Sequence, residues 1–234
     1  MKALILGCSH AAGAEMYQDT SITIDNPGSF GWLNSYPVSV ARRLGYEPMN
    51  YAISGGSNDA MFRIFIEQLK NLTTNDVVIA CWTGCSRTEL WHDIDKCWLP
   101  MSMGRQHWTR YKSSTYALSG DNDGGKISFE EEYLAYADEW NKFHLNQQAS
   151  NQNKLKNILA LNALATQHGI RVININSFHP VEYTDRVNWA IDTDFCAWCE
   201  TNKYPHTDWG HYFLAAHQAF ADQVVAWLQV NCKP

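Results

Sequence analysis

The sequence has no long hydrophobic run and no excess of basic residues, and each absence excludes a class of protein. No apolar run approaches the roughly 18 residues that a helix needs to cross a bilayer. The 234 residues carry a formal net charge of −6, so the basic surface typical of nucleic-acid binding is missing. Met1 and Lys2 lead directly into an apolar strand, without the regions of a secretory signal. We therefore expect no membrane span, no nucleic-acid partner and a cytoplasmic location.

Disulfide signals are also missing, although the chain has seven cysteines. The number is odd, and Cys8 and Cys81 lie inside apolar runs, which is typical of reduced, buried thiols. This pattern favours folding in a reducing compartment. A chain of this length can bury one large core, and we expect a single domain over residues 1–234.

What the sequence does contain is an alternation of strand and helix patterns. Apolar runs predict strands, and segments with helical spacing follow them. The predicted strands cover residues 4–6, 49–53, 77–82 and 170–175, with a short one at 187–191, and the predicted helices cover residues 32–44, 57–69, 130–145, 151–168 and 207–230. Such alternation indicates right-handed crossovers and a parallel sheet. We expect an α/β fold: a three-layer α/β/α flavodoxin-like domain with a parallel sheet of four or five strands.

A segment at about 87–129 interrupts this alternation and is predicted to be an irregular, aromatic-rich insertion. A loop this long in a compact domain is usually functional. Its aromatic residues would form a lid or a carbohydrate-stacking surface, or would bury the insertion against the core. They are Trp91, Trp98, Trp108 and Tyr111.

A serine follows the first predicted strand, in the turn Gly7-Cys8-Ser9. Residues just past the carboxyl ends of parallel strands line the usual binding crevice, and a serine nucleophile would lie there. The plainer interpretation is that Ser9 caps a turn or a helix, because a single Gly-x-Ser pattern has little specificity. Two later segments strengthen the first interpretation: Asn-Tyr-Ala-Ile-Ser-Gly-Gly-Ser-Asn-Asp at 50–59 and Asp-Trp-Gly-His at 208–211.

Together these three segments resemble the blocks of the SGNH, or GDSL-type, hydrolases, in the variant whose first block reads Gly-Cys-Ser. Residues 50–59 are similar to the family's Asn-x-x-Ile-Ser-Gly stretch, and residues 208–211 have its Asp-x-x-His form. The resemblance implies that Ser9 is the nucleophile and that a histidine is the base, oriented by Asp208. It also implies that the backbone amides of Ser9 and Gly55 stabilise the oxyanion, and that no cofactor is needed.

The third block departs from the family pattern. The family has Gly-x-Asn-Asp after the third strand, whereas this chain has Trp-Thr-Gly-Cys-Ser-Arg at 82–87, with Cys85 at the asparagine position. A replacement donor for the oxyanion could come from the Asn58 amide or from the charged Arg87. Asn58 could equally cap the helix that follows it. Arg63, on an amphipathic helix, is expected to face solvent.

Two histidines compete for the role of base. The ungapped register pairs Asp208 with His211, three residues on. The alternative takes His206 as the base and lets Asp208 cap the last helix, which helix capping favours because Thr207 or Asp208 can accept from its first amides. His10, beside Ser9, points to the same crevice and is expected to pack there or to contact substrate.

The predicted function is hydrolysis of an ester through an acyl-enzyme, with a small-molecule or carbohydrate ester as substrate, such as an acetyl group on a sugar. Two alternatives belong to other classes. Cys196, Cys199, His206 and His211 have soft ligand atoms and a His-x4-His spacing that a structural zinc ion accepts. A fold that has lost its chemistry could instead bind glycans through the aromatic insertion.

Overall fold

The computed structural model describes most of the chain outside the middle segment. The described residues are 1–14, 16, 30–85, 87–92, 97–100, 139, 147–178, 187–208 and 210–231. Two predictions lie outside them: the helix at 130–145, and the greater part of the insertion, including Trp108 and Tyr111. Of the described helices, none is both long enough and apolar enough to cross a membrane.

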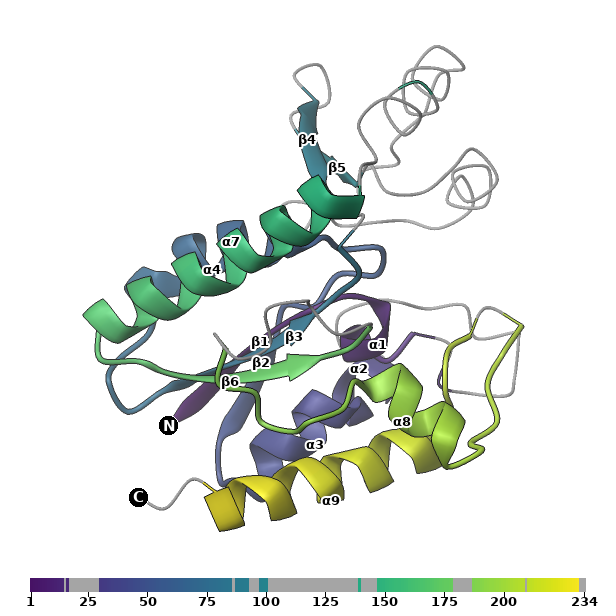
Figure 1. Cartoon of the computed structure of the whole chain (residues 1–234). Helices are drawn as coiled ribbons and strands as arrows, with labels where there is room; N and C mark the ends of the chain where they lie inside the picture. The colour runs from purple at the N-terminus through teal and green to yellow at the C-terminus, as the bar shows by residue number, and fades with distance from the viewer. Residues whose placement is uncertain are drawn as a thin grey trace.

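A parallel sheet of four strands forms the middle layer, in the order β2-β1-β3-β6 (Figure 1). The strands are β1 (Lys2–Leu6), β2 (Glu47–Asn50), β3 (Val77–Trp82) and β6 (Arg171–Asn176). The predicted fold class is confirmed. The predicted fifth strand is reduced to one parallel bridge, between Asn174 and Trp189.

Helices cover both faces of this sheet (Figure 1). One face carries α1 (Ser9–Ala12), α2 (Phe30–Asn34), α3 (Tyr36–Arg43), α8 (Phe195–Thr201) and α9 (Leu214–Asn231). The other face carries α4 (Asn58–Gln68), which runs into the short η1 (Leu69–Asn71), and α7 (Gln147–Gln167). The odd-numbered residues of β3 pack against the first set and the even-numbered ones against the second. Burial on both faces explains the uninterrupted apolar run at 77–82.

The order of the strands places the ends of β1 and β3 at the middle of the sheet. The chain leaves β1 toward β2 on one side, and it returns past β1 to form β3 on the other side. Such a reversal of direction opens a crevice outside the carboxyl ends of the two strands, where α/β proteins usually bind ligands. Ser9 follows β1, and Arg87 lies five residues beyond the end of β3.

Two helix boundaries differ from the predicted ones. The segment at 32–44 forms two helices that meet at Ser35, and Pro37 lies in the first turn of α3, where its missing N–H costs no hydrogen bond. The last helix begins at Leu214 and not at Thr207. The reason is an antiparallel bridge between His206 and Tyr212, closed by a turn in which Gly210 has φ +76°.

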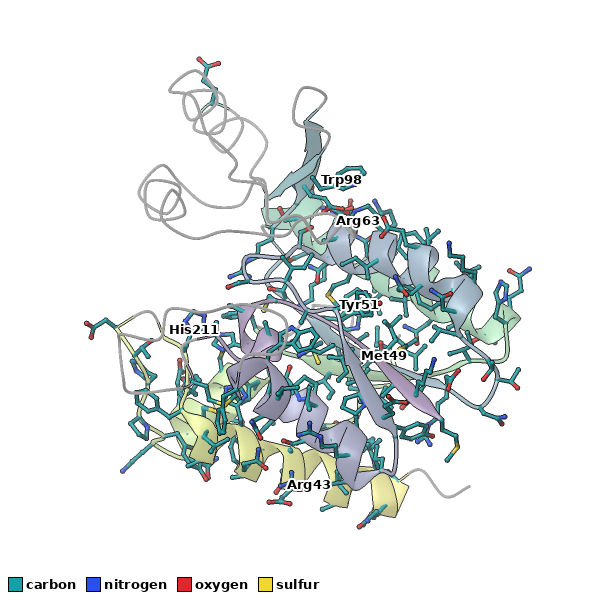
Figure 2. All side chains as sticks on the ribbon, turned by 180° about the vertical axis from the view of Figure 1, so that it is seen from behind. Arg43, Met49, Tyr51, Arg63, Trp98 and His211 are labelled. Atoms are coloured by element: carbon teal, nitrogen blue, oxygen red, sulfur yellow. The ribbon has the colours of Figure 1, made fainter. Side chains whose placement is uncertain are left out.

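The beginning of the predicted irregular insertion is a regular hairpin. β4 (Glu89–His92) pairs antiparallel with β5 (Cys97–Pro100). Arg63 on α4 does not simply face solvent, because its guanidinium donates to both oxygens of Glu89, at 2.8 and 3.0 Å, and lies 5.0 Å from the centre of the Trp98 ring (Figure 2). These contacts fix the hairpin to α4.

Candidate active site

The first two sequence blocks lie side by side at the carboxyl end of the sheet. The Tyr51 amide donates to the Ile5 carbonyl at 2.8 Å, and the Ile53 amide donates to the Gly7 carbonyl at 3.0 Å. These bonds extend the β1–β2 pairing beyond the ends of the strands. They place the turn at 53–56 directly beside the turn that leads to Ser9.

Ser9 is the first residue of α1 and is only 5% exposed. The first amides of a helix have no acceptor within the helix, and the Cys8 side chain makes no capping hydrogen bond. The turn before Ser9 is tight, since a Cβ at Gly7 would lie 2.5 Å from the Cβ of Ala11. A glycine is therefore needed for α1 to fold over the end of β1.

Gly55 lies in the neighbouring turn and adopts φ +73°, a backbone conformation that glycine reaches without strain. Gly55 and Gly56 are both buried, and the Gly56 amide donates to the Ile53 carbonyl at 2.8 Å.

Asn58 is 1% exposed and holds the turn after β3. Its Oδ1 accepts from the Thr83 amide at 3.0 Å, and its Nδ2 donates to the carbonyls of Thr83 and Gly84, at 3.4 and 3.2 Å. The Nδ2 group of the side chain is thus engaged by the carbonyl oxygens of Thr83 and Gly84. The cap of α4 is Ser57, whose Oγ accepts from the Ala60 amide at 3.0 Å.

Arg87 supplies the charge at this end of the sheet. Its guanidinium carbon lies 5.3 Å from the centre of the Phe178 ring, and its Nη1 is buried and has no hydrogen-bond partner in the described part of the chain. Cys85, at the position of the family's asparagine, is half-buried.

His10 is the most enclosed histidine of the site, at 3% exposed. Aromatic rings surround it, with centroid distances of 4.7 Å to Phe178 and 5.5 Å to Phe195, and its Nε2 lies 3.5 Å from Cys196 Sγ. Burial and then the nearby charge of His211 lower the pKa of His10 well below its usual value. His10 is therefore neutral at physiological pH.

Of the two candidate bases, the structure brings His211 to the first block. The His211 ring is half-buried, and its centroid lies 5.0 Å from that of His10 (Figure 2). Its backbone closes the turn, with the Thr207 amide donating to the His211 carbonyl at 2.9 Å. His206 is exposed and packs edge-on against Tyr212, at 5.6 Å, with Nδ1 2.7 Å from the Thr207 carbonyl oxygen.

The hydrogen bonds that a Ser-His-Asp triad would need are not formed among the described residues. Asp208 is exposed, and its carboxylate makes no hydrogen bond or ion pair with any described residue. Within the same part of the chain, no hydrogen bond joins the Ser9 hydroxyl to His206 or His211. Such bonds are often long or absent before substrate binds. Ser9, Gly55, Arg87, His10 and His211 are thus gathered at one end of the sheet, and His206 and Asp208 lie at its rim.

The four residues of the alternative zinc site do not assemble. Over the described residues, which include all four, no three His, Cys, Asp or Glu side chains are grouped so that they could hold a metal ion. Cys199 is buried in the core between α8 and α9, and Cys196 contacts His10 instead. Burial raises the pKa of both thiols, which opposes the thiolate form that zinc needs.

Lys154 is a buried cation near the site that the sequence analysis did not identify. It is 2% exposed, and its Nζ donates to Asn176 Oδ1 at 2.7 Å and to the Phe178 carbonyl at 3.3 Å. Burial lowers its pKa to about 8. The sequence does indicate this burial, because Lys154 has helical spacing with Ile158 and Leu161, which pack in the core.

No family model and no curated protein matches the chain. Several solved structures are similar to it over nearly its whole length. One is a lipolytic protein of the G-D-S-L family from Desulfitobacterium hafniense DCB-2, at 11% identity and a TM-score of 0.49, covering 97% of this chain and 99% of that one. Another is an acetyl xylan esterase from Butyrivibrio proteoclasticus, at 12% identity and a TM-score of 0.48, covering 98% of this chain and 63% of that one. A third is a carbohydrate esterase, at 10% identity and a TM-score of 0.49, covering 99% of this chain and 69% of that one.

Proposed function

We propose that the chain is an SGNH-type serine hydrolase that cleaves an ester through an acyl-enzyme on Ser9. The observation that carries the proposal is the meeting of three segments far apart in sequence. Ser9 begins α1, the Gly55 turn is hydrogen-bonded beside it, and His211 lies against His10, the next residue to Ser9. A nucleophile, oxyanion donors and a base are the groups that acyl transfer requires.

The proposed residues act in the following order. The Ser9 oxygen attacks the ester carbonyl while His211 takes its proton, and the amides of Ser9 and Gly55 stabilise the oxyanion. The intermediate collapses to acyl-Ser9, and His211 returns the proton to the leaving alcohol. Water, activated by His211, then attacks the acyl-Ser9 carbonyl, which releases the acid and restores the Ser9 hydroxyl.

Asp208 has the orienting role in this proposal because it precedes His211 on the same turn. Its carboxylate must rotate toward the ring, since it is exposed and makes no hydrogen bond or ion pair with a described residue. His10 is unsuited to act as the base, because burial keeps it neutral and its Nε2 faces Cys196. The proposed substrate is a short acyl group such as acetyl, carried by a small molecule or a carbohydrate.

Hydrolysis of p-nitrophenyl acetate by a matched set of variants tests the proposal. Ser9→Ala and His211→Ala should each lower kcat by at least about 10³-fold, because each removes a group that acts in the transition state. His206→Ala is the control, five residues from His211 and outside the site, and should stay within about threefold of wild type. Full activity of Ser9→Ala would disprove the assignment. A folded wild type without turnover would favour the glycan-binding alternative.

A further inference from the structure

Arg87 is a cation at the site whose charge no described residue balances. Its side chain makes no hydrogen bond and no ion pair within the described part of the chain, and Nη1 is completely buried. Arg63 shows the contrast, because Glu89 and Glu67 accept from three of its nitrogens. Buried polar groups in folded proteins almost always have hydrogen-bond partners. The guanidinium, with its buried and unpaired Nη1, therefore indicates a site for an anionic group.

Phe178 connects Arg87 to His10, the residue next to Ser9. The guanidinium carbon lies 5.3 Å from the centre of the Phe178 ring, and the centre of the His10 ring lies 4.7 Å from that of Phe178. The His10 Nδ1 atom is also buried and has no hydrogen-bond partner among the described residues. If the Cys196 thiol donates to Nε2, the proton of the neutral ring is on Nδ1, which then offers a second donor.

We propose that Arg87, with His10 beside it, binds a carboxylate on the substrate, so that the enzyme prefers esters that carry a negative charge. This inference rests on the proposed function and names the substrate class for it. A carboxylate fits because the planar guanidinium offers two parallel N–H bonds to it, and the cation–π contact with Phe178, at 5.3 Å, helps to position the guanidinium. Arg87 thus determines the preference for substrates that carry a carboxylate in addition to the ester.

A binding experiment tests this inference without turnover. In the Ser9→Ala protein, calorimetry compares monomethyl succinate with neutral dimethyl succinate, and acetoxyacetate with methyl acetoxyacetate. The first pair carries the charge on the acyl side and the second on the alcohol side. The anionic member of at least one pair should bind at least about tenfold more tightly, and Arg87→Gln should abolish the difference. Equal binding within both pairs would overturn the proposal, as would tighter Arg87-dependent binding of inorganic phosphate.

Kinetics then separate an anion anchor from an oxyanion donor. For the pair of esters that shows the binding difference, Arg87→Gln should raise KM for the anionic ester at least about tenfold more than KM for the neutral one. Arg42→Gln, which changes an exposed arginine on α3, is the matched control. An equal fall of kcat on both esters would overturn the anchor, because it would place Arg87 on the oxyanion. The binding experiment stays interpretable even if Ser9 is not the nucleophile.

Discussion

His217 shows how one buried side chain makes the whole fold sensitive to acid. It is 1% exposed on α9, and its Nδ1 accepts from the Tyr36 amide at 3.1 Å. Burial, and then the charge of His211, lower its pKa to about 3. Protonation in the folded state would place a charge in the core and remove the acceptor for Tyr36.

The fold should therefore lose stability as pH falls below the unfolded pKa of 6.5 toward the folded pKa of about 3. In this window the unfolded chain binds a proton that the folded chain does not. Between pH 7.5 and pH 5.0 this difference amounts to about 2 kcal/mol of unfolding free energy, at about 1.4 kcal/mol per pH unit. Urea unfolding of wild type and His217→Gln at both pH values measures it. The variant keeps an acceptor for Tyr36 and should lose about 2 kcal/mol less; equal losses would contradict the lowered pKa.

At single positions, the sequence alone was sufficient for residues whose role is set by their immediate neighbours in the chain. Gly55 was identified from the Ile-Ser-Gly stretch at 53–55, and the structure places it in a turn with φ +73°. Contacts with distant segments could not be predicted in this way. The side chain of Asn58 is hydrogen-bonded to residues 25 and 26 positions later, and the Lys154 amine is hydrogen-bonded to Asn176 and Phe178.

Among the elements, the β4–β5 hairpin depends on polar contacts with its neighbours. Arg63 binds Glu89 through two bonds, and Asp59 on α4 accepts from Thr88 Oγ1 at 2.7 Å and from Asn157 Nδ2 at 2.8 Å. Both ends of the Arg63–Glu89 pair are largely buried, with side-chain exposures of 17% and 9%. A pair of this kind is costly to break, because the remaining charge stays buried.

Arg63→Met should loosen this hairpin while keeping an unbranched apolar stem in place of the arginine side chain. The uncompensated Glu89 carboxylate is expected to weaken docking by about 1 to 3 kcal/mol. Hydrogen exchange at residues 89–92 and 97–100 should then be about 10- to 100-fold faster. The control is Glu67→Gln, because Glu67 is the exposed i+4 partner of Arg63 and should contribute only about 0.3 to 0.5 kcal/mol. Wild-type exchange in Arg63→Met would show that the pair does not hold the hairpin.

The core elements were predictable because their apolar patterns are strong, and the elements at the site were less so. β1, β3 and β6 lie within one residue or two of their predicted limits. The start of α9 was misplaced because Thr207 and Asp208 resemble a helix cap, whereas a cross-chain bridge and Gly210 fold this segment into a turn. Such a bridge depends on residues paired across the turn and leaves no periodic pattern.

At the scale of the whole molecule, the sheet order determines where chemistry can occur. β1 and β3 are neighbours at the middle of the sheet, and the segments that follow them carry Ser9 and Arg87. The helices of one face bring His211 to this crevice through the turn before α9, while α7 on the other face brings Lys154 (Figure 1). One helix layer thus supplies the proposed base, and the other supplies a buried cation near the site.

Labelling with a fluorophosphonate probe tests the central claim, an activated Ser9, most directly. The probe forms a covalent adduct with a serine whose proton a neighbouring base removes. Peptide mapping by mass spectrometry should place the adduct on Ser9, and Ser9→Ala and heat-denatured wild type should both stay unlabelled. The buried serines of the neighbouring turn, Ser54 and Ser57, serve as internal controls. An adduct on another serine, or none on the folded protein, would contradict the account.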